Sequence, residues 1–221
     1  MSVVKVNNLC LEIHAYKILD DISFELQKGD CLGLIGATGS GKTMLLEVMA
    51  TLVKPTSGKI EIGGYNTLKQ SKQVKQIIGY VPENFDGYDD LLVQEYLDLF
   101  ASAYHISRGQ RSQIITDSLE LVGMIEYRKK YLYELSKGEK QQLCWAKSIL
   151  HDPWVFLLDA PILWTDLTRQ EEFADLIGEL VAMQKTIIAT SNNSNGMEKF
   201  CNKLGQLEKG KMVLFGNIED V

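Results

Sequence analysis

Several features that would mark other classes of protein are scarce or missing in this chain of 221 residues. No apolar run approaches the roughly 18 residues of a membrane-spanning helix, and the amino-terminal residues do not resemble a signal peptide. No basic block interrupts the chain, and 23 basic against 29 acidic residues give a net charge of −6, so we expect no nucleic-acid partner. The cysteines lack C-x-x-C spacing, which predicts free, buried thiols at Cys10, Cys31, Cys144 and Cys201.

The most informative motif that is present fits the phosphate-binding pattern G-x-x-x-x-G-K-[ST] without a gap. Its residues are Gly36, Ala37, Thr38, Gly39, Ser40, Gly41, Lys42 and Thr43. An apolar run at 31–35 precedes it and a helical pattern at 44–49 follows it. The glycines allow successive N–H groups to point inward at the positive end of a helix. We expect Lys42 to reach the β- and γ-phosphates and the Thr43 hydroxyl to bind Mg²⁺; a glycine-rich turn without a ligand is the alternative.

Hydrophobic periodicity predicts an α/β core that contains a helical insertion. Strands are expected near residues 4–13, 22–26, 31–35, 59–62, 77–81, 154–158 and 186–190, followed by a hairpin of 203–207 and 211–215. Between them, helical stripes comprise Tyr96, Leu97, Phe100 and Tyr104, and then Ile114, Ile115, Leu119, Leu121 and Val122. We therefore expect one domain over 1–221, with its core in 1–83 and 153–221 and a helical insertion over 84–152.

A second motif, Leu-Ser-Lys-Gly-Glu at 135–139, stands shortly before the apolar run 155–158 and Asp159. It resembles the L-S-G-G-Q signature of ATP-binding cassette (ABC) ATPases, and residues 55–58 and 77–82 also resemble that family. The resemblance covers essentially the whole chain. It implies a P-loop NTPase core with a mostly parallel sheet flanked by helices, an antiparallel β subdomain and an inserted α-helical subdomain. Residues 93–97 are most similar to exporter-type cassettes that pair with separate permease subunits.

The resemblance also implies roles for residues outside the phosphate-binding loop. Tyr16 stands where the family stacks an aromatic ring on adenine; a half-exposed strand tyrosine is the alternative. Ser136 and Gly138 match signature residues that contact the γ-phosphate of ATP bound to the opposite subunit, whereas Lys137 and Glu139 depart from the signature. A helix cap at Ser136, with Glu139 at the third helical position, explains the same residues, and both interpretations can hold.

Three departures from the family pattern concern hydrolysis. Ala160 stands where a carboxylate activates the attacking water, Glu83 replaces the Q-loop glutamine, and Asn192 replaces the switch histidine. A positioned general base contributes about 10²–10⁴-fold in rate, so we expect a site that binds ATP and Mg²⁺, the latter through Thr43 and Asp159, but hydrolyses ATP slowly. An engineered glutamate-to-alanine change would explain Ala160 alone. It would not explain the bulky residues 162–164. Glu83 remains open as a substitute base or as a neighbour of Mg²⁺.

From these expectations we also predict the partners of the protein. The chain is predicted to dock on a membrane permease at the cytoplasmic face of the membrane and to pair with a second ABC ATPase subunit, with a heterodimer favoured over a homodimer. Phe85 and Tyr88 could fill a permease groove or pack within the helical insertion. A regulatory or scaffold protein that senses ATP is the alternative function. A phosphotransferase is less consistent with the 135–139 motif, and the absence of a long heptad insertion excludes coiled-coil chromosome ATPases.

Overall fold

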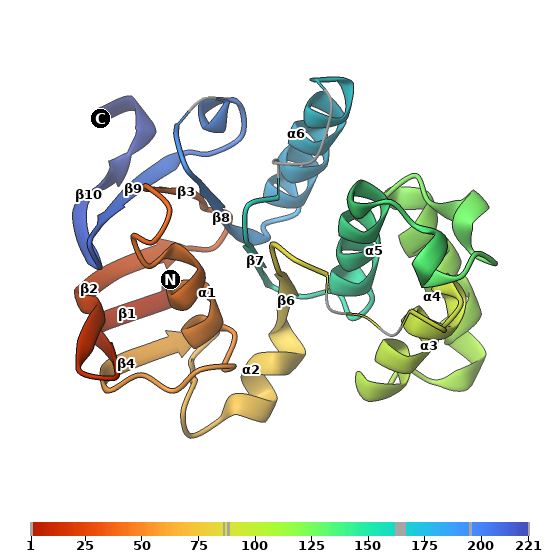
Figure 1. The fold of residues 1–221 in the computed structure, drawn as a ribbon, viewed down its shortest axis with the longest axis horizontal. Helices are drawn as coiled ribbons and strands as arrows, with labels where there is room; N and C mark the ends of the chain where they lie inside the picture. Colours follow the sequence, from red (N-terminus) through yellow and green to blue (C-terminus); the bar gives the residue numbers. More distant parts are fainter. Residues whose placement is uncertain (1, 86, 88, 162–166, 195, 221) are drawn as a thin grey trace.

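The computed structural model describes residues 2–85, 87, 89–161, 167–194 and 196–220, with residues 167–173 described by their backbone only. It contains two β-sheets with a group of helices to one side (Figure 1). The four-stranded sheet is antiparallel and has the order β2-β1-β4-β5. Its strands are β1 (Ser2–Ile13), β2 (Tyr16–Gln27), β4 (Ser57–Ile62) and β5 (Tyr65–Asn66).

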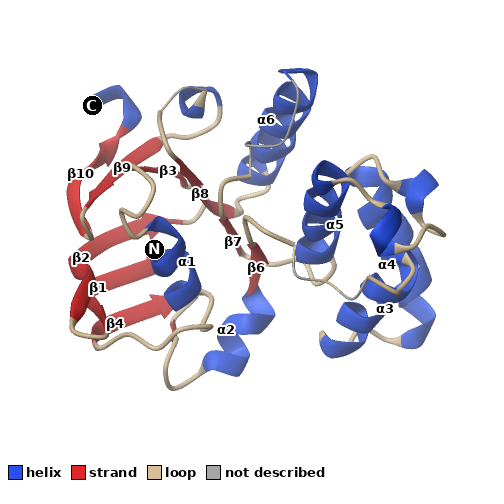
Figure 2. Ribbon diagram, in the orientation of Figure 1, coloured by secondary structure: helices blue, strands red, loops and turns tan. Residues whose placement is uncertain are grey.

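The six-stranded sheet has the order β10-β9-β3-β8-β7-β6 and is parallel except at its β9–β10 hairpin. Its strands are β3 (Cys31–Ile35), β6 (Ile78–Val81), β7 (Val155–Leu158), β8 (Thr186–Ser191), β9 (Lys203–Glu208) and β10 (Lys211–Asn217). Figure 2 shows both sheets against the helices. The expected α/β fold, with a mostly parallel sheet and a separate antiparallel sheet, is therefore confirmed.

Alternation along the central strands separates two hydrophobic cores. In β7, Val155 and Leu157 join the core that lies against the antiparallel sheet and α1 (Lys42–Met49). Phe156 and Leu158 join the other core, on the opposite face of the sheet. Because successive strand residues point to opposite faces, a four-residue strand that is apolar throughout must be covered on both sides.

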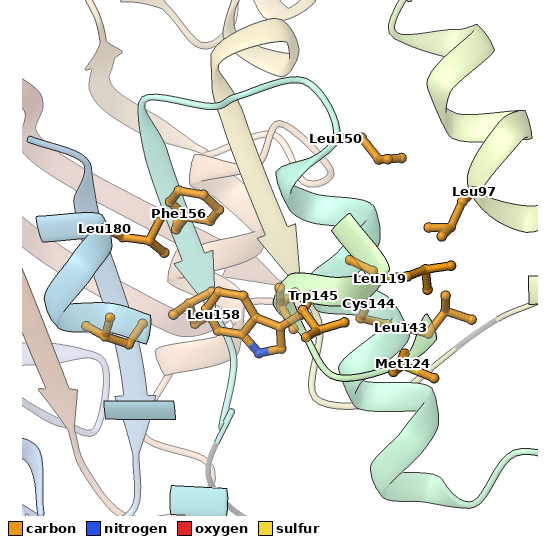
Figure 3. Packing of buried hydrophobic residues seen from close by; sticks show 14 of the residues in the cluster. Leu97, Leu119, Met124, Leu143, Cys144, Trp145, Leu150, Phe156, Leu158 and Leu180 are labelled. Atoms are coloured by element: carbon orange, nitrogen blue, oxygen red, sulfur yellow. The ribbon is translucent and has the colours of Figure 1, made fainter. Parts of the chain in front are cut away.

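The remaining helices are α2 (Ser71–Ile77), α3 (Val93–Ala103), α4 (Arg108–Leu121), α5 (Lys137–Ile149) and α6 (Leu167–Ala182). Helices α3, α4 and α5 lie together at one side of the sheets (Figure 1). Trp145 of α5 stacks on Phe156 at 6.2 Å between ring centroids and lies between β7 and the other buried residues of these helices (Figure 3). The core on this face of the sheet therefore continues into the helices, and α5 carries the connection.

The structure corrects some details of the sequence-based expectations. The helix α2 was not foreseen, because only Val74 and Ile77 within it are buried. In the second predicted stripe Ile115, Leu119 and Val122 are buried, but Leu121 is 49% exposed. No helix among the described residues has the length and apolar character that crossing a bilayer requires.

Phe85 packs within the helical region. Its ring centroid lies 5.5 Å from that of Tyr96, at a tilted angle, and the Lys140 ammonium lies over the Phe85 ring, 5.5 Å from its centroid. Of the two alternatives for Phe85, the structure therefore shows packing within the helical insertion. Tyr88, residues 162–164 and Asp166 lie outside the described residues.

Candidate functional site

The carboxyl ends of the parallel strands meet around one cavity of about 300 Å³. The phosphate-binding loop follows β3, Glu83 follows β6, Asp159 follows β7 and Asn192 follows β8. Ligands of open α/β sheets bind at this edge, because loops from neighbouring strands converge there. The cavity is lined by Ile18, Thr38, Gly39, Gly41, Lys42, Thr43, Met44, Glu83, Asp159, Ala160, Thr190, Ser191 and Asn192.

Lys42 is the buried cation of the cavity, with 8% of its surface exposed. Its Nζ donates to the backbone oxygens of Gly36 at 2.6 Å and Ala37 at 3.1 Å, so the loop closes around the ammonium. Asn192 Oδ1 accepts from the same Nζ at 3.4 Å. Burial lowers the pKa of Lys42, and the nearby carboxylates of Asp159 and Glu83 oppose that shift. An anion in the cavity would therefore meet a desolvated positive charge.

Two glycines are required by the close packing of the loop. Gly41 has φ of 108°, and a Cβ there would lie 2.9 Å from Leu19 Cδ2 and 3.0 Å from the backbone oxygen of Ile18. At Gly36, a Cβ would lie 2.4 Å from the backbone oxygen of Leu207. Strands β2 and β9 thus press against the loop where a side chain would not fit. This packing holds the loop N–H groups at the start of α1, where they favour anions.

Asp159 is 2% exposed, and its two carboxylate oxygens have different environments. Oδ1 accepts from the Thr190 hydroxyl at 2.7 Å, and that hydroxyl accepts in turn from the Ala160 backbone N–H at 2.8 Å. Oδ2 is buried and has no hydrogen-bond partner within the described residues. An unpaired buried carboxylate oxygen beside a cavity that also contains the Thr43 hydroxyl fits a hard divalent cation such as Mg²⁺.

The residues that line the cavity near Asp159 offer little that could activate water. Ala160 has only a methyl side chain, and the Asn192 amide oxygen accepts from Lys42. Glu83 is the only other carboxylate among the described residues that line the cavity. The described part of the cavity therefore combines a buried ammonium, a hydroxyl and a buried carboxylate with few other groups that could accept a proton.

The other predicted site residues lie outside the cavity lining. Gly36, Ala37 and Ser40 lie behind the Lys42 ammonium, to which each provides an oxygen. Tyr16 is 75% exposed at the start of β2. Its strand neighbour Ile18 lines the cavity instead, so the structure leaves the Tyr16 ring in solvent beside the site.

The 135–139 motif forms the start of α5, away from the cavity lining. The Ser136 hydroxyl accepts from the Glu139 backbone N–H at 3.3 Å, and the Glu139 carboxylate accepts from the Ser136 backbone N–H at 2.6 Å. The predicted helix cap is therefore present. The cap leaves the Ser136 side chain exposed at the helix end, where a second chain could reach it.

Sequence reasoning missed Thr190, which connects Asp159 to the Ala160 backbone. The available signal was its place near the carboxyl end of a predicted strand, at the edge where the other site residues follow their strands. The cavity-lining residues Ile18, Met44 and Ser191 were also missed, because each contributes contact surface without belonging to a motif.

Known proteins resemble this chain over most of its length. The chain is 31% identical over 206 residues to the ABC transporter ATP-binding protein NatA of Bacillus subtilis, covering 93% of this chain and 84% of that protein. It is 32% identical over 218 residues to an uncharacterized ABC transporter ATP-binding protein of Methanocaldococcus jannaschii, covering 99% and 79%.

Solved structures share the fold. The structure of an ATP-binding subunit of an ABC transporter superposes with a TM-score of 0.91 at 24% identity, covering 99% of this chain and 91% of that one. A dimeric ATP-binding cassette bound to ADP and Pi superposes with a TM-score of 0.87 at 20% identity, covering 97% and 98%. The family model described as ABC transporter matches residues 19–163. With the phosphate-binding loop, the buried aspartate and the 135–139 motif in their places, this chain belongs to the ABC transporter family and is one of its ATP-binding subunits.

Proposed function

We propose that this subunit holds Mg-ATP in its own site with little hydrolysis and completes a second, hydrolytic site on a different ABC ATPase subunit of an exporter-type transporter. The observation that supports this most is the composition of the cavity. Lys42, Thr43 and Asp159 line it together with Ala160 and Asn192. Compared with the family pattern, the cavity keeps the residues that would bind nucleotide and metal. The residues that would activate water for hydrolysis are replaced.

Binding follows from the charges and donors of the cavity. The ammonium of Lys42 would exchange its contacts with the loop oxygens for phosphate oxygens, and the loop N–H groups would add further donors. The Thr43 hydroxyl and the unpaired Asp159 Oδ2 would hold the cation. When bound, Mg²⁺ offsets the negative charge of the triphosphate. The exposed Tyr16 ring would stack on the base without selecting among purines.

Slow hydrolysis follows from the missing proton acceptor. Ala160 cannot deprotonate water, and the amide of Asn192 has no titratable nitrogen near neutral pH. Glu83 lies in the lining with its carboxylate close enough to influence Lys42. Beside a bound cation it would act as a neighbour of the metal, since the positive charge attracts its carboxylate.

A second subunit supplies what this chain lacks. The exposed Ser136 at the start of α5 would contact ATP held by the partner, whose own base and switch histidine would act there. A homodimer would contain two slow sites, which supports the heterodimer. The pair would act on a membrane permease at the inner face of the membrane, with residues 84–152 as the inserted helical subdomain that faces it. ATP in this chain's site would then hold the two subunits together.

The decisive experiment measures binding and turnover on the same purified chain. Calorimetry with ATP and Mg²⁺ should give saturable binding that Lys42→Ala abolishes. Phosphate release should be slow in the natural chain and rise, by about 10²-fold or more, in the double variant Ala160→Glu with Asn192→His. Vigorous hydrolysis by the natural chain alone would overturn the slow site, and absence of Mg-ATP binding would overturn the whole proposal.

Two further measurements test the finer parts. An unchanged residual rate in Glu83→Gln would eliminate Glu83 as a substitute base, as we expect. Copurification from native membranes should recover a permease together with a second, different ATPase chain. Recovery of homodimers alone would contradict the heterodimer, and recovery of only a soluble partner would favour an ATP-sensing regulator.

A further inference from the structure

Three sulfur atoms meet in the core at the start of β3, and the nucleotide cavity uses none of them. The Cys31 and Cys201 sulfurs lie 3.3 Å apart, and the Cys201 thiol donates to the Met197 sulfur at 3.9 Å. Cys31 and Met197 are fully buried, and Cys201 is 5% exposed. The sulfurs therefore form one chain of contacts, from Cys31 through Cys201 to Met197, that protein encloses.

The topology of the parallel sheet brings these residues together from opposite parts of the chain. Strand β3 lies between β8 and β9 (Figure 1), and the chain that joins β8 to β9, here called the crossing segment, is described over 192–194 and 196–202. Cys31 and Gly33 point to the same face of β3, as alternate residues of a strand do. A Cβ at Gly33 would lie 3.4 Å from both the Cys201 and the Met197 sulfur. The crossing segment therefore packs on this face of β3, where the glycine leaves room for the sulfurs.

The backbones of the two cysteines are held at a spacing that a disulfide can bridge. The Asn202 N–H donates to the Cys31 oxygen at 3.1 Å, and the Asn202 side-chain oxygen accepts from the Cys31 N–H at 2.9 Å. Paired strands lie about 4.8 Å apart, and disulfides join Cα atoms about 4.4–6.8 Å apart. The sulfurs would have to approach from 3.3 Å to about 2.05 Å, the length of the bond. The pair can therefore be joined by a small movement of the side chains.

The hydrogen bonds of the pair distinguish the two thiols. Because the Cys201 proton is directed to Met197, the proton between the two cysteines belongs to Cys31. A Cys201 thiolate would accept that hydrogen bond and be stabilised by it. The hydrogen bond to Cys201, together with burial, raises the pKa of Cys31, so Cys31 stays protonated. Cys201 is therefore the better nucleophile of the two.

From this arrangement we infer that Cys31 and Cys201 are a redox-sensitive pair, which a peroxide converts to an intramolecular disulfide that fastens the crossing segment to β3. The Cys201 thiolate attacks one oxygen of hydrogen peroxide, breaks the O–O bond and becomes a sulfenic acid. The departing hydroxide takes up the proton that Cys201 lost. The Cys31 sulfur then attacks the Cys201 sulfur, and the hydroxyl group leaves as water with the Cys31 proton. Two thiols and one peroxide thus give one disulfide and two water molecules.

A disulfide suits this position better than a bound cation does. The disulfide is neutral, whereas two thiolates on a soft monovalent cation would leave a negative charge in the core, where Asp30 already acts on Cys31. No group of three histidine, cysteine, aspartate or glutamate residues that could hold a metal occurs in the described part of the chain.

The disulfide would restrain a segment that also reaches the nucleotide cavity. The crossing segment begins with Asn192, whose amide oxygen accepts from Lys42 at 3.4 Å, and Cys201 lies near its other end. Oxidation would thus join this segment to the strand that leads into the phosphate-binding loop. The inference goes beyond the proposed function and does not depend on it, because the sulfur chemistry takes place in the core whether or not nucleotide binds.

Peptide mapping of the natural chain tests the pair directly. The reduced, folded chain is treated with hydrogen peroxide in the presence of a metal chelator, the remaining thiols are blocked, and the chain is digested without a reductant. We expect a cross-linked peptide that joins Cys31 to Cys201. The melting temperature should rise by about 5–10 °C, because a disulfide that closes a long loop restricts the unfolded chain. Dithiothreitol should reverse both changes.

Single variants test the order of the two steps. In Cys31→Ala, dimedone should trap a sulfenic acid at Cys201, and in Cys201→Ala it should leave Cys31 unmodified. Neither variant should gain melting temperature with peroxide, and circular dichroism verifies that each folds. Cys10→Ser is the matched control, since it removes the half-buried thiol and should keep both the cross-link and the rise.

Several outcomes would overturn the inference. Absence of the cross-link between Cys31 and Cys201 in the natural chain does so without any variant, as do cross-links that join Cys10 or two chains instead. A cross-link without a rise in melting temperature would show that the disulfide does not fasten the crossing segment to β3. Trapping at Cys31 in Cys201→Ala would reverse the order of attack. None of these results bears on Mg-ATP binding, so the proposed function stands or fails separately.

Discussion

Thr190 shows how much one side chain without a motif can contribute. Its hydroxyl donates to Asp159 Oδ1 and accepts from the Ala160 N–H, so one oxygen orients the Asp159 carboxylate and the backbone beyond it. Both contacts are buried, since Thr190 is 1% exposed and Asp159 is 2% exposed. Holding Oδ1 leaves Oδ2 as the oxygen available to a cation.

The variant Thr190→Val should weaken both the fold and cation-dependent nucleotide binding. Valine keeps the shape of threonine, so the change leaves Asp159 Oδ1 and the Ala160 N–H without their partner and should cost about 1–3 kcal/mol of unfolding free energy. Urea unfolding measures the loss, and ATP binding with and without Mg²⁺ measures the effect on the cation. Thr116→Val, at a half-buried position of α4 where the hydroxyl donates to the Ser112 oxygen and accepts from Arg128, is the control and should cost less. Equal stability of Thr190→Val and the natural chain would refute the role of the hydroxyl.

The thiols provide a second test at the level of single side chains. Cys31, Cys144 and Cys201 are free and buried, as expected from their spacing, and Cys10 is half-buried. The Cys31 and Cys201 sulfurs lie 3.3 Å apart, and the hydrogen bond to Cys201, together with burial, raises the pKa of Cys31. A higher pKa means less of the thiolate that reacts.

A disulfide reagent should therefore modify Cys10 first. In the native chain we expect one thiol to react quickly, and all four to react after denaturation. The variant Cys10→Ser should lose the rapid phase and keep the slow one. Rapid modification of Cys31 or Cys201 in the folded chain would show that this part of the core opens more readily than its burial implies.

Helices and strands differ in how far the sequence determines them. The strands of the parallel sheet were predicted to within a residue or two, because buried strands are short, apolar runs that turns interrupt. The start of α5 was predicted from its capping box, a local pattern that the structure contains. Helix α2 was missed because its burial depends on tertiary neighbours and not on a repeated apolar pattern.

The residues of the site also differ in whether the sequence alone predicts them. That residues of the 36–43 loop and Asp159 line one cavity could be predicted, because each follows a strand of the parallel sheet. Thr190 and the contact from Gln141 to Pro82 could not, because both depend on which strands and helices become neighbours. That information is present only in the folded chain.

The turn between β1 and β2 contains strain that a substitution can relieve. His14 and Ala15 have φ of 48° and 66°, the left-handed values of a two-residue type I′ turn, and neither is glycine or asparagine. Ala15→Gly should raise the unfolding free energy by about 0.5–1 kcal/mol, since the relief exceeds the entropy that glycine adds to the unfolded chain. Ala103→Gly, at the exposed end of α3, should instead lower it. A thermal melt in which Ala15→Gly is the less stable variant would contradict the turn assignment.

Across the entire chain, the sheet and the helical region are joined along α5. Trp145 packs on Phe156, Gln141 reaches Pro82 and His151 reaches Ile78, so one helix contacts both β6 and β7. The apolar contact supplies most of the attachment, because burying aromatic surface stabilises more than a neutral hydrogen bond does. The two polar contacts determine where the helix lies along the strand.

The acid sensitivity of this junction follows from the titration of His151. Burial lowers the pKa of His151 to about 4 from an ordinary 6.5, and the opposing hydrogen bond to Ile78 does not offset it. Above the ordinary value both the folded and the unfolded histidine are neutral, so its contribution to stability is complete. As the pH falls between 6.5 and about 4, the unfolded chain binds the proton preferentially and stability declines, by at most about 3 kcal/mol in total.

The variant His151→Gln should reduce that decline, because glutamine retains a donor for the Ile78 oxygen and does not titrate. Urea unfolding from about pH 7 to about pH 4.5 should show a shallower dependence in His151→Gln than in the natural chain. The exposed His105, replaced in the same way, is the matched control. Because the natural chain and His151→Gln share every other titratable group, the difference between the curves isolates the histidine at the junction. Parallel curves for the natural chain and His151→Gln would mean that His151 is protonated without cost and that α5 is held to β6 by apolar packing alone.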